Sequence, residues 1–457
     1  MMKQQTSKFA ANSRTVSMCI RSRLKAWLWP SMLVLALLWS PAQARLVIEI
    51  SGGEVGALPI AIVPFAGERS YDNPLSEVIR ANLTRSGRFA PMATDRLPAR
   101  PTHASEIDFS RWRSSGVDHM VIGRTQTQGD GQVLVQFQLF DALRGVQMAG
   151  YSITVPPQRL RKLAHQISDI VYERITGEKG AFDTLVSYVA VEQIGNERMF
   201  RLAVADADGH NEQIILSSKD PLMSPSWAPD GVNLAYVSFE EGRSQIYVQN
   251  IRTGQRERVA GFTGINSAPA WSPDGRYLAM TLSRDGQPDI YIMEVSSRQV
   301  MRITNSPGID TEPAWAPDGR SLVFTSNRGG RPQIYLQALQ GIRPQGSPRR
   351  LTFEGNYNAR ARFSPDGRHL AVVHGEGNRF RIGLLELESR QFRILTDTGR
   401  EESPSFAPNG SMIIYATERH HRGVLEAVSV DGRSQQRLGA SRGDVREPAW
   451  SPFISQN

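Results

Sequence analysis

The segment AWSPDGRYLAM, residues 270–280, recurs nearly unchanged as AWAPDGRSLVF from Ala314 and as SWAPDGVNLAY from Ser226. The aromatic position of this motif occurs six times along the chain, at Trp227, Trp271, Trp315, Phe363, Phe406 and Trp450. The spacings between successive copies are 44, 44, 48, 43 and 44 residues. Repeats of about this length form the four-stranded blades of a β-propeller. The sequence therefore predicts a propeller with six blades.

Within each copy, Pro-Asp-Gly has the chemistry of a tight turn between two strands. Pro fixes φ at the first corner, Asp accepts a hydrogen bond from the nearby backbone, and Gly tolerates a positive φ. Asn409 replaces Asp in the fifth copy, and the same turn accepts Asn. We therefore expect the turn aspartates to be structural rather than paired catalytic carboxylates; they are Asp230, Asp274, Asp318 and Asp366. The motif tryptophans are expected to pack between blades.

The two ends of the repeat region complement each other. The sixth copy, EPAWSPF, stops soon after Pro452, with no Asp-Gly turn and no later strands. Residues 185–216 contain strands without a preceding motif, and Asp208-Gly209 there matches Asp431-Gly432 in the fifth repeat. We expect the C-terminal strand to complete a blade that begins near residue 183, because closure removes the open sheet edges. The propeller is thus predicted to span residues 183–457.

Residues 45–182 have a different pattern, that of a small mixed α/β domain. LPIAIVPF, residues 58–65, is typical of a buried strand, and a helix capped by Asn73 with Pro74 at its first position is expected to follow. VDHMVIGRT, QVLVQFQLFDA and VQMAGYSITV predict three adjacent strands. A second helix is expected to bury Leu160, Leu163, Ile167, Ile170 and Val171 on one face.

Residues 1–44 have the pattern of a cleaved export signal. Arg21, Arg23 and Lys25 precede the apolar run WLWPSMLVLALLW, which is too short to span a bilayer comfortably and leads to A-x-A spacing before Arg45. We expect cleavage between Ala44 and Arg45 and a periplasmic mature chain without a membrane span. The sequence leaves both Met1 and Met18 open as the start.

Charge and cysteine content narrow the functional classes further. The formal net charge is +8, and residues 1–44 carry six Lys and Arg with no Asp or Glu, so the mature chain has 8 − 6 = +2. This near neutrality gives no reason to expect nucleic acid as a partner. The single cysteine, Cys19, lies within the signal, so the mature protein has no disulfide and no cysteine ligand for a metal.

The motifs of common catalytic sites are missing from the sequence. GYSIT at Gly150 lacks the final Gly of a nucleophile elbow, and GEGNRF at Gly375 lacks the Lys of a phosphate-binding loop. His420 and His421 are expected to be solvated loop residues rather than metal ligands. We therefore expect no catalytic residue, no metal site and no cofactor. A propeller-based hydrolase or lyase, or a sugar-binding propeller, is the alternative interpretation.

The polar loops before the repeated aromatics suggest binding instead. Each lies just before a predicted first strand: Ser224-Pro225, Ser267-Ala268-Pro269, Thr311-Glu312-Pro313, Ser403-Pro404 and Glu447-Pro448. Repeats place equivalent loops on one face of the ring, around the central channel. The prolines are expected to shape the entry to the strand. Their polar neighbours are candidates for recognition of another protein.

The sequence resembles the TolB family of the bacterial Tol-Pal system. The resemblance is carried by the export signal, the α/β region with PIAIVPF, the segment TEPAWAPDGRSLVFTS and the final EPAWSP, and it covers essentially the whole mature chain. It implies a non-enzymatic periplasmic scaffold. Its implied partners are Pal, the peptidoglycan-associated outer-membrane lipoprotein, and TolA, which is anchored in the inner membrane; other envelope proteins remain open as further partners.

The resemblance also assigns candidate binding residues. Contacts with Pal would fall on Ile265, Ala268, Thr311, Glu312 and Pro313, with Ile265 at a position where family members carry His. The strand that binds TolA would be Arg45, Leu46, Val47, Ile48, Glu49, Ile50, Ser51 and Gly52. The residues themselves show a short alternating strand there, which could pair within its own domain or add to the sheet edge of another protein.

Overall fold

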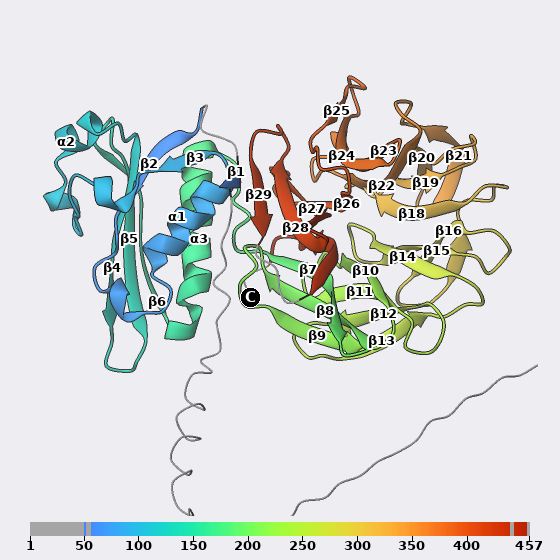
Figure 1. Ribbon diagram of the computed structural model, residues 1–457. Helices are drawn as coiled ribbons and strands as arrows, with labels where there is room; N and C mark the ends of the chain where they lie inside the picture. Colours follow the sequence, from blue (N-terminus) through green and yellow to red (C-terminus); the bar gives the residue numbers. More distant parts are fainter. Residues whose placement is uncertain (1–49, 52–55, 439–442, 455–457) are drawn as a thin grey trace, which may run out of the picture. The chain divides into compact units, whose positions relative to one another are not determined.

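A computed structural model gives the fold, and it describes residues 50–51, 56–438 and 443–454. The described strands form one mixed sheet and six sheets of a propeller (Figure 1). The fold class predicted from the repeat is therefore confirmed. Within the described ranges, no helix is both long and apolar enough to cross a membrane.

The α/β domain is built on a five-stranded sheet with the order β3-β2-β4-β5-β6. Its strands are β2 (Leu58–Ile62), β3 (Phe89–Pro91), β4 (His119–Thr127), β5 (Val133–Asp141) and β6 (Val146–Val155). Its helices are α1 (Leu75–Arg85), α2 (Phe109–Ser114) and α3 (Leu160–Thr176). Short 3-10 turns lie at Glu68–Ser70, Thr94–Arg96, Ala104–Glu106 and Pro157–Arg159.

Two apolar clusters cover the two faces of this sheet. Helices α1 and α3 lie side by side (Figure 1), and their apolar stripes pack with β2 and β5 in the larger cluster. Trp112 of α2 is fully buried in the smaller cluster. The three strands predicted to be adjacent are neighbours, and they pair antiparallel as β4-β5-β6. The periodicity of the sequence thus located the main elements of this domain.

The predicted cap of the first helix is wrong. Helix α1 begins at Leu75, and Pro74, at φ −55° and ψ 130°, is the N-cap without any side-chain capping bond. The Asn73 side chain is used elsewhere, because its Oδ1 accepts a hydrogen bond of 3.3 Å from Nη1 of Arg161. A contact with the distant helix α3 therefore replaces the local cap that the sequence suggested.

Each propeller blade contains four antiparallel strands of the repeat region, and the sheet of blade 5 contains one more. Blades 1 to 3 contain β10 (Leu222–Trp227), β11 (Asn233–Ser238), β12 (Gln245–Asn250), β13 (Arg256–Ala260), β14 (Asn266–Trp271), β15 (Tyr277–Leu282), β16 (Asp289–Glu294), β17 (Val300–Arg302), β18 (Asp310–Trp315), β19 (Ser321–Ser326), β20 (Gln333–Gln340) and β21 (Arg343–Arg350). Blades 4 to 6 contain β22 (Tyr357–Phe363), β23 (His369–Glu376), β24 (Arg379–Glu386), β25 (Phe392–Ile394), β26 (Glu402–Phe406), β27 (Met412–Arg419), β28 (Arg422–Ser429), β29 (Gln435–Leu438), β30 (Asp444–Trp450), β7 (Leu185–Ile194), β8 (Glu197–Asp206) and β9 (Gln213–Ser218).

Blade 6 closes the ring from both ends of the propeller sequence. The C-terminal strand β30 pairs antiparallel with β7, with Trp450 opposite Val186, and Val445 is buried between blades. The first strands of the six blades contact one another in a closed cycle. The predicted closure by the C-terminal strand is confirmed: β30 covers the edge of β7 and becomes the first strand of blade 6.

The repeated motif performs the structural work predicted for it. In each Pro-Asp-Gly turn the Asp or Asn Oδ1 accepts a backbone N–H two residues later, at 2.8–3.1 Å. The motif tryptophans join blades: Nε1 of Trp227 donates to the Ala449 carbonyl at 3.0 Å, and Nε1 of Trp315 donates to the Ala270 carbonyl at 3.1 Å. The turn aspartates and the tryptophans are therefore structural.

Candidate functional site

Each first strand of the propeller contains the same bulge at the channel. The pairing with the second strand shifts register at one equivalent place in all six blades. One residue of each bulge has a positive φ of 50–58°: Ser224, Ala268, Glu312, Arg360, Ser403 and Glu447. Non-glycine residues seldom adopt this conformation, and bulges of this kind redirect side chains. We call these six residues the bulge ring.

Proline follows the bulge residue in five of the six blades. The exception is blade 4, where Ala361 follows Arg360. A bulge interrupts the hydrogen-bonded ladder, so it tolerates a residue that has no N–H. The Ser-Pro and Glu-Pro pairs singled out in the sequence therefore mark the bulges. Sequence reasoning missed Arg360 because its blade lacks the proline that marks the other copies.

The bulge ring surrounds a cavity of about 410 Å³ in the central channel. Residues from all six first strands line it, among them Ser224, Ala268, Glu312, Arg360, Ser403 and Glu447. Met223, Phe239 and Ile265 add apolar surface at the same cavity. A rigid ring of strands thus presents polar and apolar side chains together, which is the usual composition of a binding site.

A charged network spans the cavity from blade to blade. Nε of Arg360 donates to Oε1 of Glu312 at 2.7 Å, and its Nη2 lies 3.7 Å from Oε1 of Glu447. A further hydrogen bond joins Nη1 of Arg360 to Oγ of Ser403. Burial alone would lower the pKa of Arg360, but the nearby carboxylates of Glu312, Glu447 and Glu402 outweigh burial and raise it. The guanidinium therefore stays charged and ties blades 3, 5 and 6 to blade 4.

The structure brings four of the five residues assigned to Pal to this cavity. Ala268, Thr311 and Glu312 line it, and Ile265 lies at its edge with 45% of its surface exposed. Pro313 is buried and lies outside the cavity lining. Whether these residues bind Pal stays a prediction.

Comparison with known proteins identifies the family. The family described as "TolB amino-terminal domain" matches residues 46–148, and the family described as "TolB beta propeller domain" matches residues 172–454. The Tol-Pal system protein TolB of Thioalkalivibrio sulfidiphilus is 57% identical over 427 residues, which cover 93% of this chain and 97% of that protein. The chain belongs to the TolB family. Tol-Pal system protein TolB from Nitrosococcus oceani is 55% identical over 92% of this chain and 96% of its own.

The likeness to the TolB family extends to the three-dimensional fold. The crystal structure of TolB from Acinetobacter baumannii covers 89% of this chain and 100% of its own, with a TM-score of 0.82 and 41% identity. The chain therefore acts in the Tol-Pal system of the cell envelope. Its family consists of propeller scaffold proteins and is not known as enzymatic. The domain boundary predicted at residues 182–183 stays a prediction.

The predicted TolA-binding strand of this TolB-family chain lies mostly outside the described residues. Residues 45–49 and 52 are not described, and neither are the residues at the expected cleavage after Ala44. Ile50 and Ser51 form β1 (Ile50–Ser51), which pairs antiparallel with β29 opposite Gln436 and Gln435. The described part of the strand therefore adds a fifth strand to blade 5.

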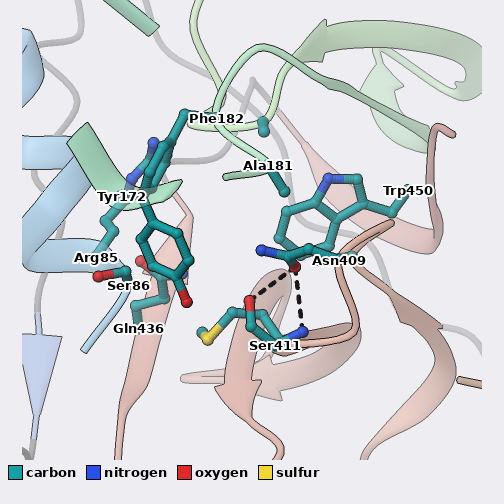
Figure 2. Close-up of a pocket in the computed structure, with 12 residues that line it drawn as sticks. Arg85, Ser86, Tyr172, Ala181, Phe182, Asn409, Ser411, Gln436 and Trp450 are labelled. Carbon is teal, nitrogen blue, oxygen red and sulfur yellow. Dashed lines mark hydrogen bonds between the residues drawn. The ribbon is translucent and has the colours of Figure 1, made fainter. Parts of the chain in front are cut away.

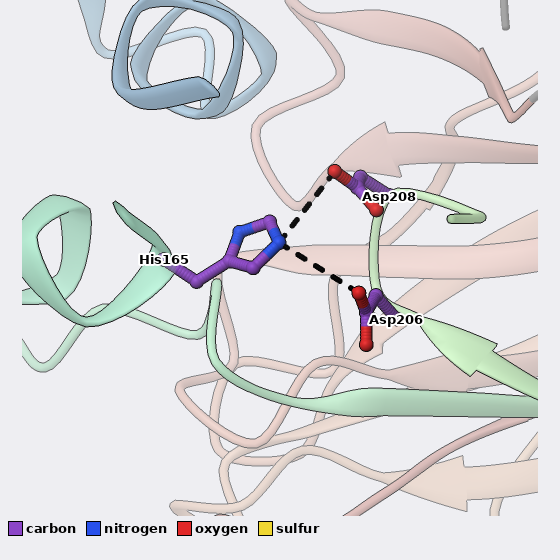
Figure 3. Close-up of side chains that lie close together, drawn as sticks. All are labelled: His165, Asp206 and Asp208. Carbon is purple, nitrogen blue, oxygen red and sulfur yellow. Dashed lines mark ion pairs between the residues drawn. The ribbon is translucent and has the colours of Figure 1, made fainter. Parts of the chain in front are cut away.

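Among the described residues, one histidine and two carboxylates lie close enough together to suggest a metal site (Figure 3). Nε2 of His165 is 3.7 Å from Oδ2 of Asp208 and 3.9 Å from Oδ2 of Asp206. Arg161 already pairs with both aspartates. Burial lowers the pKa of His165 to about 3, so its ring is neutral.

The proton of His165 argues against a metal in this arrangement. Nδ2 of Asn82, which can only donate, lies 2.9 Å from Nδ1 of His165, so Nδ1 accepts and Nε2 carries the proton. Oδ1 of Asn82 accepts from Arg85 at 2.5 Å, which fixes the orientation of the amide. The cluster is therefore an ionic contact that holds helix α3 to the end of β8, and its Nε2–H points at the carboxylates.

A second enclosed space is too small for an organic ligand. The cavity in Figure 2 has a volume of about 30 Å³ and is lined by Arg85, Tyr172, Phe182, Gln436 and Trp450, among others. This volume accommodates about one water molecule. Asn409 at its border accepts hydrogen bonds from the backbone N–H and hydroxyl of Ser411, at 3.1 and 2.8 Å. The small volume and these contacts make the cavity a packing feature.

Proposed function

We propose that this chain is a non-enzymatic periplasmic scaffold that binds Pal at the propeller channel and TolA through residues 45–52. In this role it links the inner and outer membranes, and it serves outer-membrane invagination during cell division and envelope integrity. The export-signal pattern of residues 1–44 supports the periplasmic location. Membership of the Tol-Pal system supports partners within that system.

Exposed apolar side chains in the loops that lead into three first strands carry this proposal, and one of them, Ile265, lines the channel cavity. Ile265, Ile309 and Phe353 are 45%, 45% and 62% exposed, and each lies in the connection that leads into the first strand of a blade. The loops belong to three consecutive blades, and we call these three side chains the entry rim. Exposed apolar side chains close to polar ones are typical of surfaces that bind another protein.

The entry rim is held in place by its neighbours. The Arg350 guanidinium lies 5.0 Å from the centre of the Phe353 ring, a cation–π contact that restrains the most exposed of the three side chains. The backbone N–H of Ile309 donates to Oδ1 of Asn327 at 2.7 Å, and that of Ile265 donates to Oγ of Ser283 at 2.7 Å. Such restraint lowers the entropy that binding would otherwise remove.

Replacing Ile309 by Asp should weaken binding of Pal about 10- to 100-fold, because a buried Ile contributes about 1.5–3 kcal/mol and the new carboxylate would be desolvated. Isothermal titration of purified Pal into the chain beginning at Arg45 measures this change.

Ile214→Asp is the matched control for this experiment. Ile214 is 41% exposed and lies in β9, the outermost strand of blade 6, away from the channel lining. It should bind Pal like the wild type. Equal weakening by the two substitutions, or no weakening by Ile309→Asp, would contradict docking on the entry rim.

Deleting residues 45–52 should abolish binding of TolA, about a 100-fold loss or more, while the affinity for Pal changes less than about twofold. The reason is that strand addition uses the backbone of the added segment, whereas the entry rim remains intact. Ile48→Asp should reproduce much of the loss, and Glu49→Gln, at a polar position of the alternating sequence pattern, should not. Parallel titrations with TolA and Pal measure both affinities. Loss of binding to both partners in the same variant would argue against separate sites.

A further inference from the structure

One position of the channel breaks the similarity between the six blades. The residue directly before the repeated aromatic is small in five first strands: Ser226, Ala270, Ala314, Ser405 and Ala449. In β22 of blade 4 the equivalent residue is Arg362, and it lines the channel cavity. Packing of the first strands against one another is satisfied by Ala or Ser at this position in the other blades. The long cationic side chain therefore calls for a separate explanation.

Arg362 lacks the partners that the other channel charges have. Its Nη1 donates to the carbonyl of the adjacent Ala361 at 2.9 Å, and it forms no ion pair with any described residue. The neighbouring Arg360, in contrast, contacts Glu312, Ser403 and Glu447. Burial lowers the pKa of Arg362, and the more distant Glu312 and Glu447 oppose this effect only in part. A half-buried guanidinium thus faces the cavity with most of its donors unused by the protein.

We propose that Arg362 binds a carboxylate carried by the segment of the docked partner that reaches into the channel. This inference rests on the proposed function, since it assumes that Pal occupies the cavity. The planar guanidinium matches a carboxylate through two parallel hydrogen bonds. Glu312 and Glu447 line the same cavity, so a singly charged carboxylate is favoured over a doubly charged phosphate, which they would repel more strongly.

The first experiment measures the affinity of Pal for three variants by isothermal titration. Arg362→Ala introduces a residue that other blades carry at this position, and it should weaken binding about 10- to 100-fold, the effect of losing charge-assisted hydrogen bonds. Arg362→Lys keeps the positive charge but loses the two parallel hydrogen bonds, so its affinity for Pal should lie between that of Arg362→Ala and that of the wild type. Arg368→Ala removes an exposed arginine of the same blade outside the cavity lining, and it should bind like the wild type.

The outcomes separate this inference from the proposed function. Loss of binding in Ile309→Asp with unchanged binding in Arg362→Ala would leave docking intact and overturn the role of Arg362. If Arg362→Ala and Arg368→Ala weakened Pal binding equally, the loss of one positive charge would explain both effects, and the role proposed for Arg362 would be overturned. Thermal melting of each variant verifies that the propeller is folded, and Arg362→Ala should melt close to the wild type.

A second measurement does not depend on Pal. The Nε–H signal of Arg362 in a nitrogen-15 correlation spectrum, assigned by its absence in Arg362→Ala, should shift when sodium acetate is added. An equal concentration of sodium chloride is the control for ionic strength. No acetate-specific shift would overturn the carboxylate site even if wild-type Pal failed to bind, whereas that failure itself would count against the proposed function.

Discussion

Removing residues 444–457, and with them strand β30, should leave a chain that no longer unfolds cooperatively. The deletion exposes the edge of β7 and removes the buried Val445, together with the Ala449 carbonyl that accepts from Trp227 and the Trp450 indole that donates to Thr184 at 2.9 Å. The ladder and these side chains together contribute about 5–10 kcal/mol. A folded domain is stable by about 5–15 kcal/mol in total, so most of the stability is lost.

Circular dichroism during urea and thermal unfolding measures this loss. Deletion of residues 455–457 alone is the matched control, because it shortens the same end of the chain and leaves β30 in place; its unfolding should match the wild type. A truncated chain without β30 that still melted in one sharp transition near the wild-type temperature would show that five complete blades suffice.

The sequence revealed those features of the propeller that each repeat carries in its own residues. The Pro-Asp-Gly turn needs only neighbouring backbone groups, so its role could be predicted from Asp274 or Asp318 alone. Closure could be predicted because the single strand that ends at Trp450 and the surplus strands from Leu185 complement each other. Both features depend on local chemistry and counting, and the structure confirms both.

Features that depend on which blades face each other could not be predicted from the sequence. Arg360 has no proline after it, and its partners Glu312 and Glu447 are 48 and 87 residues away, so nothing local indicates the network across the channel. The helix cap failed for a similar reason, because Asn73 contacts Arg161, 88 residues later. Contacts of this kind depend on the closed ring and on the packing inside the α/β domain, so a local sequence pattern does not reveal them.

Asp208 and Asp431 occupy equivalent turns, but they have different partners that the sequence does not reveal. Both precede glycine in equivalent turns, and each accepts a backbone N–H two residues later, at 3.1 and 3.0 Å. Asp431 is half exposed, with Arg433 no closer than 4.0 Å. Asp208 is buried and pairs with Arg161 of α3, while the buried Arg85 of α1 contributes a second positive charge. The two aspartates therefore make the same turn contact but are expected to contribute very differently to stability.

Replacing Asp208 by Asn should lower the free energy of unfolding by about 3–5 kcal/mol, because the largely buried guanidinium of Arg161 then keeps only the more distant carboxylate of Asp206, at 3.9 Å. Asp431→Asn makes the same chemical change in the equivalent turn and should cost less than about 1 kcal/mol. Urea unfolding, monitored by tryptophan fluorescence, measures the free energy of unfolding of the two variants. The double variant Arg161→Met with Asp208→Asn should recover part of the loss, and equal costs for the two single variants would contradict the ionic contact.

The pH dependence of this loss provides an independent check on its cause. Burial alone would raise the pKa of Asp208, but the contact with His210 and the charges of Arg85 and Arg161 outweigh burial and hold the pKa well below the usual 3.8. A depressed pKa means that the stabilisation is present above the unfolded-state value and is lost as the pH falls through the folded-state value. The difference in stability between wild type and Asp208→Asn should therefore narrow as the pH is lowered below 3.8. A difference that stayed constant down to the acid transition would assign the loss to turn geometry instead of the charge of Asp208, because a loss that does not depend on this charge does not change as the carboxylate is protonated.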